Sequence, residues 1–225
     1  MAGASSRLDR GGLPAAIETG LVVGMAKRQT GTQTTLRDRV TISGIGVHSG
    51  ALVNMTLLPA EPDTGILFYR TDLDDRADIG IPANISEIGP TELCTTLGLG
   101  ALSVGTVEHL LAAFSGLSID NVIVEIDGAE VPVMDGSAAA FVEAIDSVGI
   151  AVQSAPRAYI EVLKRLRVEQ GSSYAELRPH EGRRFEIEID FDHELVGRQM
   201  VIVDLDSESF RTELARARTF GFLAD

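Results

Sequence analysis

Two spacings of hydrophobic residues follow one another along this chain, and their order restricts the folds that it can adopt. Apolar and polar residues alternate in RVTIS (39–43), ALVNMTLL (51–58) and ILFYRT (66–71), which is the pattern of half-buried β-strands. In TVEHLLAAFSG (106–116) the apolar residues instead recur at the spacing of one face of an α-helix. Strands that precede helices, rather than alternating with them one by one, indicate an α+β fold.

A further strand and a second helix are predicted to follow. NVIVEI (121–126) has the composition of a strand, and MDGSAAAFVEAIDSVG (134–149) that of a helix. Asp135 or Ser137 can cap this second helix, and the final glycine can end it. Thr106 is the expected cap of the first helix. The first unit is therefore expected to contain several strands and two helices that flank a strand.

A second unit is predicted after Pro156, and its order of elements repeats that of the first, as expected for an internal duplication. Its predicted elements are the strands in YIEVLKRLRVEQ (159–170), YAELRP (174–179) and RFEIEIDF (184–191) and the helix in SESFRTELARA (207–217). No second helix follows before Asp225. We therefore expect an incomplete second half that exposes apolar surface and is less stable than the first half.

The N-terminal residues differ in composition from the rest. Residues 1–31 are rich in Gly, Ala, Ser and Thr and show no sustained period, so we predict a mostly disordered extension, with order beginning near Thr34. The expected division is this extension, a first α+β domain at 32–154 that carries the pair Glu108-His109, and the first part of a second α+β domain at 155–225.

Composition excludes several classes of protein. With 33 acidic against 19 basic residues the net charge is −14, which repels nucleic acid, so an anionic substrate needs a local cluster of basic groups or helix N-termini. No apolar run reaches the ~18 residues of a membrane span, no secretory signal is visible, and Cys94 is the single cysteine. We expect a cytoplasmic monomer without stable membrane insertion.

Glu108 and His109 stand side by side at the start of the predicted helix, and two interpretations are open. A carboxylate in a first helical turn is favoured by the helix dipole alone. A hydrolytic zinc site, in contrast, needs three protein ligands, an open position and a nearby carboxylate as general base. A second ligand on one helix face must lie three or four residues away, and none of the four histidines is followed by a histidine or carboxylate at that spacing.

Three other segments contain candidate functional residues, each with an ordinary structural interpretation. His48 lies in the glycine-rich turn GIGVHSG (44–50), which lacks the strand-turn-helix context of a dinucleotide site. Cys94 is more commonly a small buried side chain than a nucleophile. ARTFGF (217–222) combines a hydroxyl with two aromatic rings, which is typical of a core turn but also suits a sugar with an apolar arm.

The segments SGIGVHSG, LLPAEPDTGILFYRTDL, TELCTTL, GTVEHLLAAFSGLSIDNVIVEIDGAEVPVMDGSAAAFV and ARTFGF occur together in one order. In that order and spacing the chain resembles the UDP-3-O-acyl-N-acetylglucosamine deacetylases, from about Thr34 to Asp225. The resemblance implies two similar α+β halves with helices sandwiched between two β-sheets. It also implies a zinc amidase of lipid A biosynthesis, which releases acetate from the UDP-linked, 3-O-acylated N-acetylglucosamine in the committed step.

The resemblance also implies roles for particular residues. His109 matches the family's first zinc ligand, and Glu108 matches the general base that takes a proton from zinc-bound water. His48 matches a loop histidine at the substrate site, and Leu93 and Cys94 match residues near the acyl-chain passage and the rim of the active site. The residues that match the lining of the sugar and acyl sites are Thr219, Phe220 and Phe222.

The resemblance further implies that the family's other zinc ligands, in a His-x-x-x-Asp motif, and a further histidine would lie beyond residue 225. We therefore expect these 225 residues to be an N-terminal fragment that binds zinc poorly and is inactive or nearly so. The alternative is a non-catalytic relative that binds a UDP-sugar lipid or another partner without turnover. The presence of Glu108 argues against a relative that only binds, because such a protein has no use for a general base beside a former metal ligand. This argument is weaker if Glu108 only caps the helix.

Overall fold

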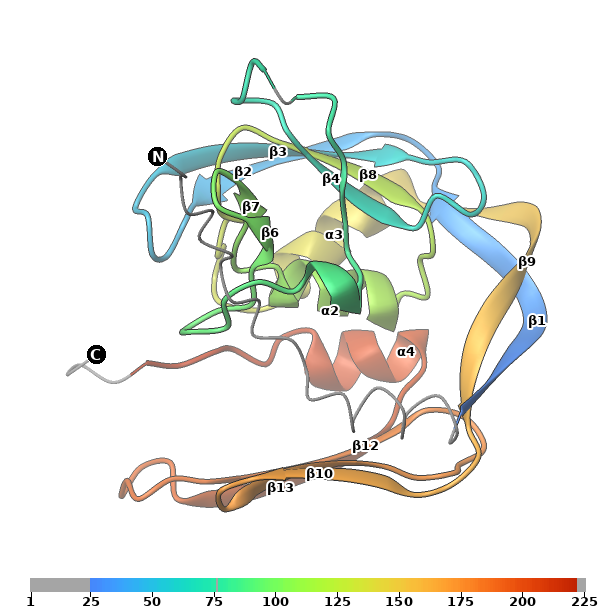
Figure 1. The fold of residues 1–225 in the computed structure, drawn as a ribbon, viewed down its shortest axis with the longest axis vertical. Helices are drawn as coiled ribbons and strands as arrows, with labels where there is room; N and C mark the ends of the chain where they lie inside the picture. Colours follow the sequence, from blue (N-terminus) through green and yellow to red (C-terminus); the bar gives the residue numbers. More distant parts are fainter. Residues whose placement is uncertain (1–24, 76, 222–225) are drawn as a thin grey trace, which may run out of the picture. The chain divides into compact units, whose positions relative to one another are not determined.

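The computed structural model describes residues 25–75 and 77–221, and the side chains from residue 31 onward (Figure 1). Most of the predicted extension, residues 1–24, lies outside the described residues. Strand β1 begins at Met25, before the expected start of order near Thr34. It pairs with β9 (Ile150–Val162), and backbone pairing of this kind needs no alternation of side chains.

Strands and helices occur in largely separate runs along the chain. The remaining strands are β2 (Val40–Ile45), β3 (Leu52–Pro59), β4 (Ile66–Arg70), β5 (Ile81–Pro82), β6 (Leu97–Leu99), β7 (Leu102–Val104), β8 (Val122–Ile126), β10 (Leu166–Gln170), β11 (Ser173–Leu177), β12 (Arg184–Asp190) and β13 (Arg198–Asp204). The helical segments are η1 (Ile85–Glu87), α2 (Glu108–Gly116), α3 (Ala139–Val148), α4 (Ser207–Ser209) and η2 (Phe210–Leu214). This mixture agrees with the predicted α+β class, while the sandwich of two similar halves stays a prediction.

The chain divides into two compact units. We call residues 31–157 with 182–221 the large unit, and residues 158–181 with the described residues before Gly31 the hairpin unit. The hairpin unit contains the antiparallel pair of β10 and β11. None of the helices in the described part of the chain is long and apolar enough to cross a membrane.

A five-stranded sheet in the order β2-β3-β8-β4-β5 forms the centre of the large unit. The sequence predicts four of its strands correctly and misses β5. In β3, for example, Val53, Met55 and Leu57 all point into the core and are at most 1% exposed. β8 pairs antiparallel with β3 and parallel with β4. Helices α2 and α3 lie against this sheet (Figure 1) and contribute to the same hydrophobic cluster.

The helix ends partly differ from those that the sequence predicts. Gly149 ends α3 with a positive φ of 80°, as expected. Thr106 is not the cap of α2, because it lies outside the helix with φ of 56° and its hydroxyl donates to Glu130. Neither Asp135 nor Ser137 is the cap residue of α3, because that position is Ala138, which makes no side-chain cap hydrogen bond. The Ser137 hydroxyl lies just before the helix and accepts a hydrogen bond from the Ala139 amide.

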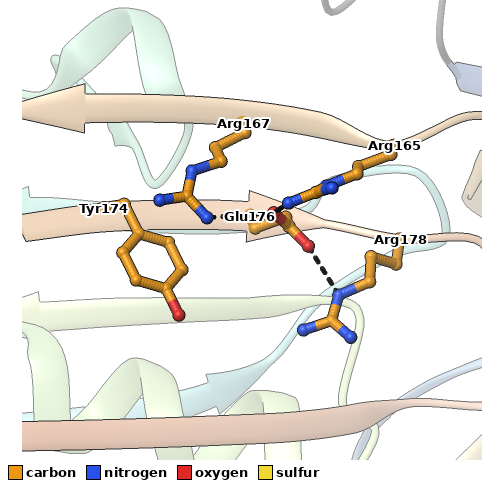
Figure 2. Close-up of a pocket in the computed structure, with 5 residues that line it drawn as sticks. All are labelled: Arg165, Arg167, Tyr174, Glu176 and Arg178. Atoms are coloured by element: carbon orange, nitrogen blue, oxygen red, sulfur yellow. Dashed lines mark hydrogen bonds and ion pairs between the residues drawn. The ribbon is translucent and has the colours of Figure 1, made fainter.

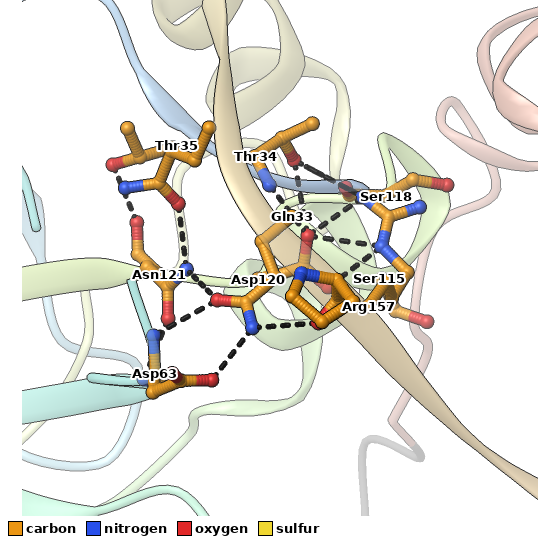
Figure 3. A network of polar contacts seen from close by, with 12 residues as sticks. Gln33, Thr34, Thr35, Asp63, Ser115, Ser118, Asp120, Asn121 and Arg157 are labelled. Atoms are coloured by element: carbon orange, nitrogen blue, oxygen red, sulfur yellow. Dashed lines mark hydrogen bonds and ion pairs between the residues drawn. The ribbon is translucent and has the colours of Figure 1, made fainter. Parts of the chain in front are cut away.

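Polar side chains join the N-terminal strand to the segment between α2 and β8 (Figure 3). Asn121 is 1% exposed, donates to Gln33 and accepts from the Gly65 amide. Arg157 on β9 forms a bidentate ion pair with Asp120. These contacts satisfy buried polar groups that would otherwise destabilise the fold, and they hold the end of the segment that leads from α2 into β8.

The part of the large unit beyond residue 182 contains β12, β13, α4 and η2. β12 confirms a predicted strand and pairs with β13, which the sequence analysis had not identified. Asp206 caps the predicted helix by accepting from the Glu208 and Ser209 amides. Apolar side chains of this hairpin remain exposed, at 45% for Phe185 and 59% for Met200. The expected exposed apolar surface is therefore confirmed, and lower stability stays a prediction.

Gly116 is the position where this later segment packs against α2. A Cβ atom added at Gly116 would lie 2.2 Å from a ring carbon of Phe210, which is 5% exposed. We expect Gly116→Ala to lower the free energy of unfolding by about 1–3 kcal/mol through overpacking, as measured by urea denaturation.

A helix otherwise favours alanine over glycine, so a matched substitution tests the cause. In the variant Phe210→Ala the added methyl group has space, and Gly116→Ala should become neutral or stabilising in that background. A loss of the same size in both backgrounds would contradict the packing explanation.

Candidate active site

Helix α2 places the two residues of the Glu-His pair at its N-terminal end. Glu108 is the first residue of the helix and is exposed, and His109 is half-buried. The helix dipole stabilises a carboxylate at this position. Glu108 Oε1 accepts a hydrogen bond from the backbone amide of Thr95. The carboxylate is therefore held by a neighbouring loop as well as favoured by its own helix.

The loop that contains Thr95 also carries Leu93 and Cys94. Leu93 is 86% exposed and has a positive φ of 63°, a backbone conformation that is rare for a residue with a side chain. Cys94 is half-buried, with its Sγ 4.0 Å from Thr96 Oγ1. The structure thus brings the predicted rim residues into the loop that contacts Glu108.

His48 belongs to an exposed loop between β2 and β3. The backbone amides of His48 and Ser49 donate to the two carboxylate oxygens of Glu130, over 3.0 and 2.9 Å. Thr106 Oγ1 donates to the same carboxylate over 3.0 Å. Glu130 therefore connects the loop of His48 with the residues that lead into Glu108 and His109.

Glu130 is 5% exposed and the sequence analysis had not identified it as a site residue. Burial raises the pKa of its carboxyl, but the hydrogen bonds from the His48 and Ser49 amides and from the Ser49 and Thr106 side chains outweigh burial, so the pKa is below its ordinary value. The only signal in the sequence was an acidic residue followed by the uncharged stretch VPVM (131–134), because the backbone amides that donate to Glu130 have no sequence signature.

The ARTFGF segment lies beside the loop that precedes α3. The Thr219 amide donates to the Gly136 carbonyl over 2.9 Å. Phe220 is 51% exposed, and its ring meets Phe191 edge to face with the ring centres 5.4 Å apart. Phe222, which was predicted to line the substrate site, lies outside the described residues.

The predicted site residues thus occur in two groups. One group surrounds the start of α2 with Glu108, His109, His48 and the loop of Leu93, and the other surrounds Gly136 with Thr219 and Phe220. The segment from Ala129 to Gly136 contacts both, since Ala129 and Val131 also form backbone hydrogen bonds with Gly105. An exposed carboxylate next to an imidazole is a combination that general acid–base chemistry can use.

The described residues do not form a complete zinc site. A hydrolytic zinc needs three protein ligands. Within residues 25–75 and 77–221, no three His, Cys, Asp or Glu side chains are placed to share a metal ion. His109 is the predicted ligand in this part of the chain.

A pocket of about 270 Å³ lies within the hairpin unit (Figure 2). Arg165, Arg167 and Arg178 surround Glu176, and each forms an ion pair with it. The Arg165 guanidinium is the main reason that the pKa of Glu176 is below its ordinary value. Arg167 also lies 3.8 Å from the ring centre of Tyr174. Alternation along β10 and β11 places these side chains on one face, which the sequence analysis had not singled out.

Comparison with known proteins shows the family to which this chain belongs. The family model described as UDP-3-O-acyl N-acetylglycosamine deacetylase matches residues 33–225. The proteins named UDP-3-O-acyl-N-acetylglucosamine deacetylase of Brucella ovis and Brucella canis are each 54% identical to this chain over 193 residues, which are 86% of this chain and 67% of each relative. The protein of the same name from Brucella melitensis is 53% identical over the same share of both chains. The chain described here therefore belongs to the UDP-3-O-acyl N-acetylglycosamine deacetylase family.

Proposed function

We propose that this chain is part of an enzyme that removes the N-acetyl group from UDP-3-O-acyl-N-acetylglucosamine in the cytoplasm, as the committed step of lipid A biosynthesis. The products are acetate and UDP-3-O-acyl-glucosamine. The observation that carries the proposal is the position of Glu108. Its carboxylate is exposed at the start of α2, inside a matched span whose relatives are named as deacetylases of this substrate.

Hydrolysis of an amide needs a base, and Glu108 is the group proposed for that role. Water adds to the acetyl carbonyl carbon while one of its protons passes to the carboxylate of Glu108. The carbon–nitrogen bond then breaks, the amine takes up a proton, and acetate leaves. The Thr95 amide donates to Glu108 Oε1 and holds the side chain in place at the start of α2.

We propose zinc as the cofactor of the complete enzyme, with His109 as one of its ligands. The described residues contain no group of three side chains that could hold a metal ion, so we propose that residues 1–225 taken alone bind zinc weakly and hydrolyse the substrate very slowly. His48, Leu93, Cys94, Thr219, Phe220 and Phe222 remain the proposed substrate-binding residues.

A zinc titration of purified residues 1–225 tests the metal proposal. One imidazole gives little affinity compared with a three-ligand site, so we expect zinc to be removed by gel filtration without a chelator. His109→Ala should change the bound zinc little. Retention of one zinc per chain through gel filtration, and its loss in His109→Ala, would contradict the proposed weak site.

The second candidate function is binding of a UDP-sugar lipid without turnover. The hydrogen bond between Glu108 and the Thr95 amide favours this candidate, because a carboxylate that holds a loop in place has a structural role and need not be a catalytic base. Sequencing beyond the codon for Asp225 separates the two candidates. A downstream His-x-x-x-Asp motif in frame supports the enzyme, and a stop codon at this position supports the binder.

A further inference from the structure

Glu130 is a buried carboxylate that receives hydrogen bonds from two separate parts of the site. We propose that Glu130 is a positioning residue, which holds the loop of His48 against the segment that leads into Glu108 and His109. The inference rests on the proposed function, because it assigns a consequence for deacetylation to this contact.

Both carboxylate oxygens of Glu130 take part. Oε1 accepts from the His48 amide and from Thr106 Oγ1, each over 3.0 Å, and Oε2 accepts from the Ser49 amide over 2.9 Å. The donors come from two elements that are far apart in the sequence. Hydrogen bonds to an ionised carboxylate are stronger than those between neutral groups, so a single side chain fixes both elements.

The backbone around Glu130 supports the same connection. The Gly105 amide donates to the Ala129 carbonyl, and the Val131 amide donates to the Gly105 carbonyl, over 2.9 and 3.0 Å. Residues 129–131 are therefore bonded to the residue immediately before Thr106. The segment holds the chain that leads into α2 in two ways: its backbone is bonded to Gly105, and the Glu130 side chain accepts a hydrogen bond from Thr106.

The backbone at Thr106 and at Gly46 has a conformation and a spacing that depend on the Glu130 carboxylate. Thr106 has a positive φ of 56°, a conformation that is costly for a residue branched at Cβ and that persists only where its surroundings enforce it. At Gly46, an added Cβ would lie 2.4 Å from Glu130 Oε2. The loop of His48 thus requires glycine at this position so that its amides can approach the carboxylate.

Amide hydrogen exchange tests the contact without any need for activity. In Glu130→Gln, one acceptor oxygen becomes an NH2 donor, so one of the His48 and Ser49 amides loses its acceptor and the other keeps only an uncharged one, which binds it more weakly. We expect their exchange in residues 1–225 to accelerate about tenfold or more. Glu125→Gln, the same change at an exposed position on β8, is the matched control and should leave both amides unchanged. Unchanged exchange in a folded Glu130→Gln variant would overturn the proposal.

Kinetics of the protein expressed from the complete coding sequence test the consequence for deacetylation. We expect Glu130→Gln to lower kcat about 10- to 100-fold at temperatures well below its unfolding midpoint, a size typical for supporting groups around a site. Thr106→Val removes a single hydrogen bond and should lower kcat less. This milder variant also serves if Glu130→Gln does not fold.

A double substitution separates positioning from a merely structural role. If Glu130 acts through Glu108, Glu108→Gln and the variant with both substitutions should have the same kcat, because the group being positioned is already absent. Multiplicative losses, or a normal kcat in Glu130→Gln with only a lower unfolding midpoint, would overturn the inference. Absence of acetate release by the unsubstituted protein would instead refute the proposed function, and amide exchange would still decide whether Glu130 holds the loop.

Discussion

Replacement of Glu108 by glutamine is expected to lower kcat for acetate release by about 10²- to 10⁴-fold in the protein expressed from the complete coding sequence. Glutamine has the shape of glutamate and keeps one acceptor oxygen for the Thr95 amide, but it cannot take the proton from water. KM should change little, since the substituted group acts in the transition state. Steady-state kinetics with the UDP-linked substrate measure both constants.

A matched control is available on the other helix of the first half. Glu143 is an exposed carboxylate on α3, and Glu143→Gln removes the same charge from a helix without changing the proposed site. We expect kcat to stay within about twofold of the unsubstituted enzyme, because surface substitutions of this kind have small effects. Equal losses in the two variants would show that net charge, rather than the base at Glu108, controls the rate.

The second large effect concerns stability. Phe114 lies on α2, one helical turn and a half after Glu108, and is fully buried. We expect Phe114→Ala to lower the free energy of unfolding by about 3–5 kcal/mol, from lost burial and from the cavity that remains. Urea denaturation followed by circular dichroism gives this value, with the slope m confirming a single transition.

Phe185 on β12 provides the comparison for Phe114. Its ring is 45% exposed, so Phe185→Ala removes less buried surface, and we expect a loss of about 1 kcal/mol or less. The difference between the two variants measures how strongly stability is concentrated in the sheet that supports α2. A loss at Phe185 as large as that at Phe114 would contradict the expected lower stability of the later segment.

Alternation and helical periodicity predict much of the first half correctly. β2, β3, β4 and β8 follow the alternating or apolar runs, because the sheet buries one set of side chains under α2 and α3. β1, β5, β6, β7 and β13 were not predicted. Pairing partners distant in the sequence stabilise β1, and nothing local to its residues shows that β9 will pair with it.

The site was only partly predictable for a related reason. Glu108, His109 and His48 stand out because a carboxylate and imidazoles carry chemistry. Glu130 and the Thr95 contact do not stand out, because their partners are backbone amides. Thr106 shows the same limit, since its hydroxyl was expected to cap α2 but donates to Glu130 from a left-handed backbone conformation. Such contacts depend on the path of the backbone, and tertiary structure rather than the local sequence determines that path.

The most direct test is product analysis with the protein expressed from the complete coding sequence and UDP-3-O-acyl-N-acetylglucosamine. Acetate and the free amine are quantified over the course of the reaction, with Glu108→Gln measured in parallel. The account predicts equal molar amounts of acetate and UDP-3-O-acyl-glucosamine, both strongly reduced in Glu108→Gln. Tight binding of the substrate with neither product formed, or equal product formation by Glu108→Gln, would contradict it.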